Sequence, residues 1–201
     1  MSESIVYIVD DDQAICDAVS GLLRSVDLQV KSFPSPAEFL QYARPDVPSC
    51  LILDVRLKGA SGLDFQSRMG ELNLNIPVIV MTAHGDIAMS VRAMKAGARD
   101  FLTKPFRDQD LLDAVAEALV QDKEHRLREQ GCSDMRSRYE SLTRREQEVM
   151  AMATAGLLNK QIAGELELSE VTVKIYRGSA MKKMRAKSFA DLVRIAEALS
   201  I

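Results

Sequence analysis

The stretch Ile5-Val6-Tyr7-Ile8-Val9-Asp10-Asp11-Asp12 joins an apolar run directly to three consecutive carboxylates. The same pattern returns at residues 50–54, where an apolar run ends at Asp54, and at residues 78–82, where one ends at Thr82. Continuous apolar runs of this length are typical of strands that are buried on both faces of a parallel sheet. The first half of the chain is therefore predicted to be an α/β domain.

Helical patterns separate these runs. Weaker strand candidates span 28–33 and 99–102, and amphipathic stretches lie near 13–26, 35–43, 61–70, 86–97 and 107–120. Five βα units predict a doubly wound domain over residues 1–120, with a five-stranded parallel sheet in the flavodoxin-like order 2-1-3-4-5. In this order the functional crevice lies at the carboxyl ends of the strands.

Carboxylates, a hydroxyl and an ammonium are expected to converge in that crevice. Acids at 10–12 follow the first strand and Asp54 ends the third, while Thr82 ends the fourth and Lys104 follows the fifth. A hard divalent ion, Mg²⁺ or Mn²⁺, would offset repulsion among the acids and the charge of a phosphoryl group. The set suits phosphoryl transfer to Asp54 as the nucleophile. Asp12 has a simpler alternative role, which is to cap the first helix.

The charge is distributed unevenly along the chain. Residues 1–120 carry 11 basic and 17 acidic side chains, whereas residues 121–201 carry 15 basic and 12 acidic ones, for a total of −3. A basic rear half suits a polyanionic partner. The charge-dense segment 121–140 is predicted to be a solvated linker, helical in its first part and broken at Gly131.

Residues 141–201 are predicted to form an all-α domain of four short helices. Thr143 and Glu146 make a capping box, and Gly156 ends the helix that begins there. Asn159, Ser169 and Ser188 are the predicted caps of the next three helices, which run to about 167, 185 and 199.

The third of these helices is basic. Residues 171–187 contain six basic residues and no acidic one. Its apolar stripe comprises Val173, Tyr176, Ala180 and Met184, and the opposite face comprises Val171, Lys174, Ile175, Gly178, Lys182 and Arg185. A short capped helix and a turn precede it, which is the arrangement of a helix-turn-helix. For the helix taken alone, an ordinary solvated basic face is the alternative.

Residues 5–120 resemble a receiver domain of two-component signalling, in the motifs VDDD at 9–12, LILDVR at 51–56, MTAHGD at 81–86 and FLTKPF at 101–106. The resemblance implies that Asp54 is the phospho-acceptor. It also implies three sets of further site residues. The metal ligands are Asp10, Asp11, Asp54 and the Arg56 backbone carbonyl; the switch residues are Thr82, Phe101 and Lys104; and Arg56 and His84 tune dephosphorylation. Many relatives have proline where this chain has Lys58, which leaves metal affinity and phosphoryl lifetime open.

Residues 142–199 resemble the LuxR-type DNA-binding domain, in LTRREQEV at 142–149, NKQIAGEL at 159–166, SEVTVK at 169–174 and MKKM at 181–184. The whole chain is similar to the FixJ/NarL class of transcription factors. The resemblance implies base contacts from Lys174, Ile175 and Gly178, and phosphate contacts from Asn159, Lys160, Thr172, Arg177 and Lys182. Leu192, Val193, Ile195 and Ala196 match the dimer contact of the family, with packing inside the domain as the alternative.

Together these resemblances imply a cytoplasmic two-component activator. A sensor histidine kinase would phosphorylate Asp54 in the presence of Mg²⁺, which would promote formation of a homodimer and binding to a double-stranded DNA operator. RNA polymerase is a further candidate partner. No membrane span or secretory signal is expected. Cys16, Cys50 and Cys132 have no metal-ligand spacing.

The sequence leaves three alternative functions to compare with this one. Haloacid-dehalogenase-like phosphatases also form an aspartyl-phosphate, but they carry an Asp-x-Asp pair after the first strand, whereas the acceptor here follows the third and Arg56 is not acidic. The chain is therefore expected to be a phospho-accepting regulator with at most self-dephosphorylation. A receiver that dimerises without phosphorylation stays open. A LuxR-type sensor of a diffusible ligand would need a different first domain.

Overall fold

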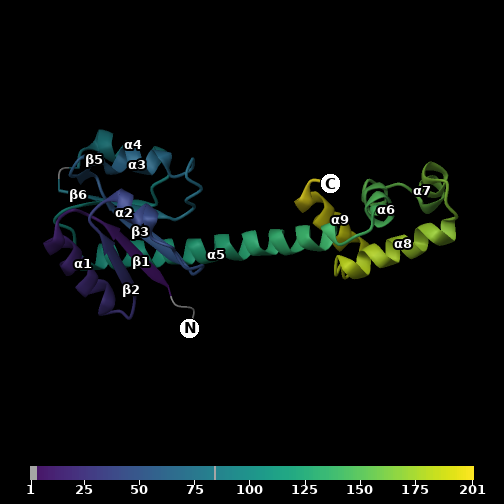
Figure 1. The fold of residues 1–201 in the computed structure, drawn as a ribbon, viewed down its shortest axis with the longest axis horizontal. Helices are drawn as coiled ribbons and strands as arrows, with labels where there is room; N and C mark the ends of the chain where they lie inside the picture. The colour runs from purple at the N-terminus through teal and green to yellow at the C-terminus, as the bar shows by residue number, and fades with distance from the viewer. Residues whose placement is uncertain (1–3, 84) are drawn as a thin grey trace. The chain divides into compact units, whose positions relative to one another are not determined.

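The first domain contains the predicted five-stranded parallel sheet. The computed structural model describes residues 4–83 and 85–201. The strands are β1 (Ile5–Val9), β2 (Gln29–Phe33), β3 (Ser49–Asp54), β6 (Val78–Thr82) and β7 (Asp100–Thr103). They pair in the order β2-β1-β3-β6-β7, and every pair is parallel (Figure 1). This is the order 2-1-3-4-5 expected from the sequence.

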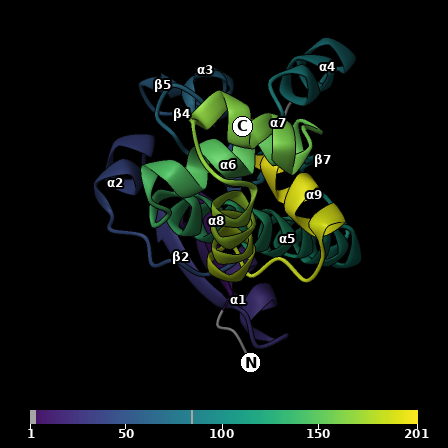
Figure 2. The same cartoon turned by 90° about the vertical axis from the view of Figure 1, so that its right-hand side faces the viewer.

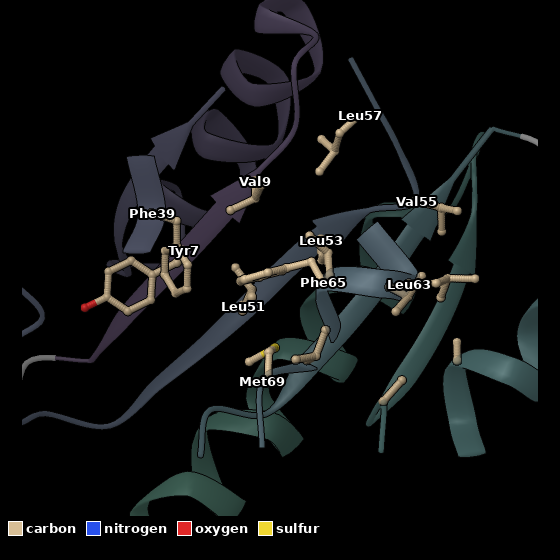
Figure 3. Close-up of a cluster of buried hydrophobic side chains, with 14 of the residues drawn as sticks. Tyr7, Val9, Phe39, Leu51, Leu53, Val55, Leu57, Leu63, Phe65 and Met69 are labelled. Carbon is tan, nitrogen blue, oxygen red and sulfur yellow. The ribbon is translucent and has the colours of Figure 1, made fainter. Parts of the chain in front are cut away.

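Helices cover both faces of this sheet. They are α1 (Gln13–Arg24), α2 (Pro36–Gln41), α3 (Gly62–Arg68), α4 (Ile87–Lys95) and α5 (Asp108–Glu140). Tyr7 and Val9 of β1 belong to a core with side chains of α2 and α3 (Figure 3), while Val6 and Ile8 belong to a second core with α1 and α5. Successive side chains of a strand point to opposite faces. Burial on both faces therefore explains why the apolar run of β1 is continuous.

A short hairpin after Asp54 was not predicted. β4 (Arg56–Leu57) and β5 (Ala60–Ser61) pair antiparallel around the two-residue turn Lys58-Gly59. Gly59 has φ +78°, a left-handed conformation that glycine adopts at little cost. Strands of two residues show no hydrophobic periodicity, so the pattern that predicted the long strands could not reveal them.

Helix α5 is longer and more regular than predicted. It runs without interruption from Asp108 to Glu140, so the expected break at Gly131 is wrong, and the segment 121–140 is helical throughout. A glycine inside a helix costs about 1 kcal/mol relative to alanine, and the helix formers on either side of Gly131 outweigh that cost. The chain divides into two compact units between Arg126 and Leu127. The domain boundaries at 120 and 140 stay a prediction.

The second unit is helical, as expected (Figures 1 and 2). It contains α6 (Arg144–Thr154), α7 (Asn159–Leu166), α8 (Glu170–Lys183) and α9 (Phe189–Leu199). The capping box of Thr143 and the caps Ser169 and Ser188 are confirmed. The prediction for Asn159 is wrong, because Leu158 is the N-cap of α7 and its backbone N–H donates to Gln161 Oε1 at 2.8 Å.

The apolar stripe of α8 faces the core of this unit. Val173, Ala180 and Met184 are fully buried. Leu192 and Ala196 of α9 are also buried in this core, which favours the packing alternative for these two residues. Over the described residues, no helix is both long and apolar enough to span a membrane.

Candidate functional site

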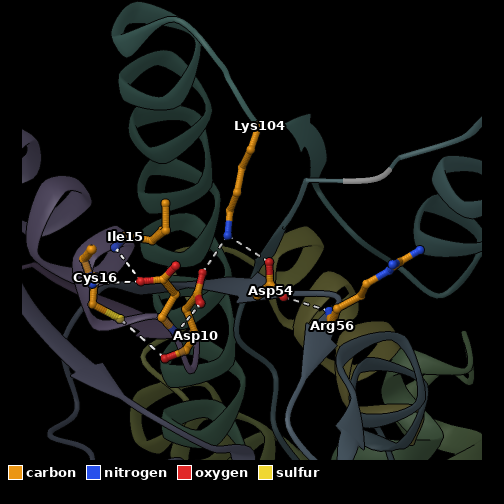
Figure 4. A network of polar contacts seen from close by, with 8 residues as sticks. Asp10, Ile15, Cys16, Asp54, Arg56 and Lys104 are labelled. Carbon is orange, nitrogen blue, oxygen red and sulfur yellow. Dashed lines mark hydrogen bonds and ion pairs between the residues drawn. The ribbon is translucent and has the colours of Figure 1, made fainter.

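Two buried carboxylates and one lysine meet at the carboxyl edge of the sheet. Lys104 Nζ lies 2.7 Å from Asp10 Oδ2 and 2.9 Å from Asp54 Oδ1, so its ammonium joins the ends of β1, β3 and β7 (Figure 4). Burial lowers the pKa of Lys104, but hydrogen bonds to Asp10 and Asp54 outweigh burial and leave that pKa raised. Lys104 is therefore a permanent cation at this edge.

The same edge offers a donor set for a divalent ion. One carboxylate oxygen from each of Asp10, Asp11 and Asp54 can be chosen so that all three lie within 4.8 Å of one another. Hard cations such as Mg²⁺ prefer such oxygen donors, so these residues fit the predicted metal. Asp12 instead caps α1, since its Oδ1 accepts the backbone N–H of Ala14 at 2.9 Å.

The backbone around Asp54 is tightly held. Asp54 Oδ2 accepts the backbone N–H of Arg56 at 2.7 Å, which places the first residue of β4 beside the predicted acceptor. A Cβ at Gly62 would lie only 2.0 Å from the backbone oxygen of Asp54. Only glycine therefore fits at position 62. No local sequence pattern marks Gly62, because its contact with Asp54 depends on how the hairpin folds back.

Lys58 contacts the site directly. Its Nζ lies 3.2 Å from Asp11 Oδ2, although the lysine side chain is 87% exposed. The lysine that stands where many relatives have proline therefore pairs with one of the predicted metal ligands.

The predicted switch residues lie on neighbouring strands. Thr82 ends β6 and is fully buried, while Phe101 in β7 is partly buried against the core that contains Ala93 of α4. A Cβ at Gly85 would lie 2.9 Å from Phe101 Cε1, so the loop before α4 packs closely on this ring. His84, the second residue predicted to tune dephosphorylation, lies outside the described residues.

Cys16 lies beside the acidic cluster without a chemical role there. Its Sγ lies 3.5 Å from the backbone oxygen of Asp10. Burial, followed by the negative charge of Asp10, raises the pKa of the Cys16 thiol to about 11. The thiol therefore stays protonated near neutral pH, and a structural role fits it better than a nucleophilic one.

The predicted base-reading face of α8 is exposed. Lys174, Gly178 and Lys182 are exposed, Ile175 is 64% exposed, and a Cβ at Gly178 would meet no atom within 4 Å. The helix thus presents cations next to one apolar and one open position, as a surface for the major groove requires.

The predicted phosphate-contact residues lie on α7 and α8. Arg177 Nη1 donates to Asn159 Oδ1 at 3.2 Å, and its guanidinium lies 4.0 Å from the centre of the Phe189 ring. Thr172 Oγ1 lies 2.8 Å from the cap hydroxyl of Ser169, and Lys160 is exposed at the start of α7. The Asn159–Arg177 contact therefore ties the first turn of α7 to α8.

Glu146 has a second role that the capping box did not reveal. Ser179 Oγ donates to Glu146 Oε1 and lies 2.5 Å away, and Lys183 Nζ lies 2.7 Å from Glu146 Oε2. Burial raises the pKa of Glu146, but the hydrogen bonds from Lys183, Ser179 and Thr143 outweigh it and bring the pKa to about 2. This carboxylate therefore joins α6 to α8.

Two family models match the chain. The response regulator receiver domain matches residues 6–116, and the luxR family of bacterial regulatory proteins matches residues 140–196. The chain belongs to the response regulators. Because a LuxR-type domain follows the receiver, this response regulator is a DNA-binding one, and its relatives are transcriptional regulators of two-component systems.

Similar proteins match this response regulator over nearly their whole length. Nodulation protein W of Bradyrhizobium diazoefficiens is 54% identical over 200 residues, which cover 100% of this chain and 88% of that protein. Response regulator protein TmoT of Ectopseudomonas mendocina is 49% identical over 197 residues, which cover 98% of this chain and 90% of that protein.

Solved structures agree with these relatives. The response regulator StyR matches with a TM-score of 0.87 and 43% identity, over 98% of this chain and 99% of its own. Full-length FixJ from B. japonicum matches with a TM-score of 0.58 and 36% identity, over 100% of this chain and 98% of its own.

Proposed function

We propose that this response regulator is switched by phosphorylation of Asp54. The observation that carries the proposal is the pairing of Lys104 with both Asp10 and Asp54, because a carboxylate that accepts a phosphoryl group needs a fixed cation and metal-binding oxygens beside it. A sensor histidine kinase is the proposed donor. In the transfer an Asp54 oxygen bonds to phosphorus while the bond from phosphorus to the histidine nitrogen breaks.

The proposed metal ligands are Asp10, Asp11, Asp54 and the backbone carbonyl of Arg56. These residues would hold Mg²⁺ or Mn²⁺, which would neutralise part of the charge on the incoming phosphoryl oxygens. Lys104 offsets part of the remaining negative charge, and the hydroxyl of Thr82 donates a hydrogen bond to the phosphoryl group. The chain then holds its own aspartyl-phosphate, and its only proposed turnover is loss of that group, tuned by Arg56 and His84.

The output is operator binding by the second unit. Thr82 moving toward the phosphoryl group would make room for Phe101, and the surface around α4 would then favour a homodimer. A dimer places two α8 helices on two half-sites of double-stranded DNA. We propose that the protein acts in the cytoplasm as a transcriptional activator, with RNA polymerase as a further candidate partner. The exposed lysines of α8 support this proposal.

The test is phosphoryl incorporation from acetyl phosphate into the full chain, with and without Mg²⁺. We expect incorporation into the wild type that requires Mg²⁺ and is lost in Asp54→Asn. Asp64→Asn is the matched control, because it removes an exposed carboxylate on α3. Equal incorporation into Asp54→Asn and the wild type would overturn the assignment of the acceptor.

A further inference from the structure

Every carboxylate of the proposed metal site is paired with a lysine in this structure. Lys104 contacts Asp10 and Asp54, and Lys58 contacts Asp11. Two ammonium groups therefore partly neutralise three carboxylates that otherwise repel one another. The repulsion that would draw a divalent ion into the cluster is reduced accordingly.

The two lysines differ in how easily each can break its ion pairs with the acids. The side chain of Lys104 is 15% exposed and bridges two buried acids, whereas that of Lys58 is 87% exposed and contacts one acid that is 19% exposed. Lys58 can therefore turn into solvent and leave one partly buried acid unpaired, whereas the departure of Lys104 would leave two buried acids unpaired.

The hairpin places Lys58 next to Asp11. Lys58 is the first residue of the turn between β4 and β5. The hairpin is fixed at its base, where Arg56 N donates to Asp54 Oδ2 at 2.7 Å and Gly62 N donates to Val55 O at 2.9 Å. The turn thus holds the Lys58 backbone near the cluster while its long side chain stays free to rotate.

We propose that Lys58 is an internal competitor of the divalent ion and sets the metal affinity of this receiver. The inference rests on the proposed function, since it takes the acidic cluster as the metal site. A divalent ion on Asp11 meets the Lys58 ammonium, which lies 3.2 Å from Oδ2 of the same carboxylate, and competes with it for the carboxylate charge. The ion therefore binds more weakly while the Lys58–Asp11 pair holds.

The size of the effect follows from the exposure of the pair. Exposed ion pairs contribute about 0.2–1 kcal/mol, which corresponds to a factor of about 1.4 to 5 in an equilibrium constant. Removing the ammonium should tighten Mg²⁺ binding by about this factor. The gain should shrink as KCl rises, because salt screens pairs at the surface.

The test is calorimetric titration of the full chain with MgCl₂ at low and high KCl. Lys58→Met keeps the side-chain length and removes the charge, Lys58→Arg keeps the charge, and Lys95→Met removes an exposed charge from α4. We expect binding that is tighter by a factor of about 1.4 to 5 in Lys58→Met at low KCl, and a smaller gain at high KCl. Lys58→Arg and Lys95→Met should bind like the wild type.

Two results would overturn the inference, and they are distinguishable. If the wild type binds Mg²⁺ and Lys58→Met binds it equally well, the competition by Lys58 is wrong while the metal site stands. If neither protein binds Mg²⁺, the proposed metal site fails and the competition fails with it. An equal gain in Lys58→Met and Lys95→Met would also overturn the inference, because net charge alone would then explain the effect.

Discussion

Gly62 illustrates how one residue without a side chain protects the proposed acceptor. A Cβ at this position would lie 2.0 Å from the Asp54 backbone oxygen and 3.0 Å from the Asp54 carbonyl carbon. Both are backbone atoms, so no side-chain rotation can relieve the overlap. The backbone of Asp54 would have to move, and the carboxylate would move with it.

We therefore predict that Gly62→Ala lowers the rate of phosphoryl incorporation from acetyl phosphate and also lowers the free energy of unfolding. Overpacking of this kind costs about 1–3 kcal/mol. Gly21→Ala is the matched control, since nothing lies within 4 Å of a Cβ there. Incorporation by Gly62→Ala at the rate of the wild type would show that the Asp54 backbone tolerates the change.

For single residues, the sequence predicted those contacts that follow from the positions of the strand ends. Asp54 ends a strand, and Asp10 and Lys104 each follow one. Parallel strands bring their carboxyl ends to one edge, so the meeting of these three residues could be inferred. The contact of Gly62 with Asp54 and the pairing of Lys58 with Asp11 depend on the path of an unpredicted hairpin. No local pattern encodes that path.

Among the elements, the contact of α6 with α8 depends on a buried carboxylate. The pKa of Glu146 is lowered from 4.5 to about 2 in the folded chain. A group with a depressed pKa stabilises the fold above its unfolded pKa, and this contribution is lost as the pH falls through the folded pKa. The second unit should therefore lose stability as the pH falls from about 4.5 toward 2.

We predict that Glu146→Gln weakens α6 and α8 by about 1.5–3 kcal/mol at neutral pH, the range for hydrogen bonds to charged groups. The difference from the wild type should shrink as the pH falls toward 2, where about half of Glu146 is protonated, and vanish below that pH. Hydrogen exchange of α6 and α8 peptides at each pH measures it, and Glu165→Gln on the exposed side of α7 is the control. A difference that persists unchanged at low pH would contradict a role for the charge.

The exposed lysines of α7 and α8 lead to a second prediction for these elements. Lys160 and Lys182 are exposed and proposed to contact phosphates. Each phosphate contact that is removed should reduce the salt dependence of DNA binding by about one unit of the logarithmic slope. Lys160→Ala and Lys182→Ala should therefore bind random double-stranded DNA more weakly with a shallower slope, measured by anisotropy. Lys95→Ala should change neither, and a slope unchanged in all three would place the DNA elsewhere.

A helix cap could be predicted from the sequence where both of its partners lie within a few residues of each other. The Thr143–Glu146 spacing predicted the start of α6, whereas the partner of Glu146 in α8 is Lys183, 37 residues along the chain. The cap of α7 was wrong because the side chain of Gln161 satisfies the backbone of Leu158, which makes a capping side chain on Asn159 unnecessary.

Across the whole molecule, α5 belongs to both compact units. Asp122 is its last buried residue, and the Asp122 carboxylate accepts the Ser49 N–H at 2.8 Å and Arg126 Nε at 2.7 Å. Further along, Met135 and Tyr139 pack on the core of the second unit. The composition of 121–140 predicted a solvated segment, but its ends are fixed by contacts that only the folded chain reveals.

We predict that the two units unfold separately despite this shared helix, because no residue of α5 after Asp122 is buried. A continuous helix transmits little cooperativity unless packing supports it, since propagation adds only a small free energy per residue. Calorimetry of the full chain should show two transitions.

Mg²⁺ at a hundred times its Kd should stabilise only the unit that contains Asp54, by about 2.7 kcal/mol. Asp54→Asn should lose that shift, and Glu146→Gln should lower only the other transition. A single transition that moves as a whole with Mg²⁺ would mean that α5 couples the units already without phosphorylation, and the switch would then act on one cooperative body.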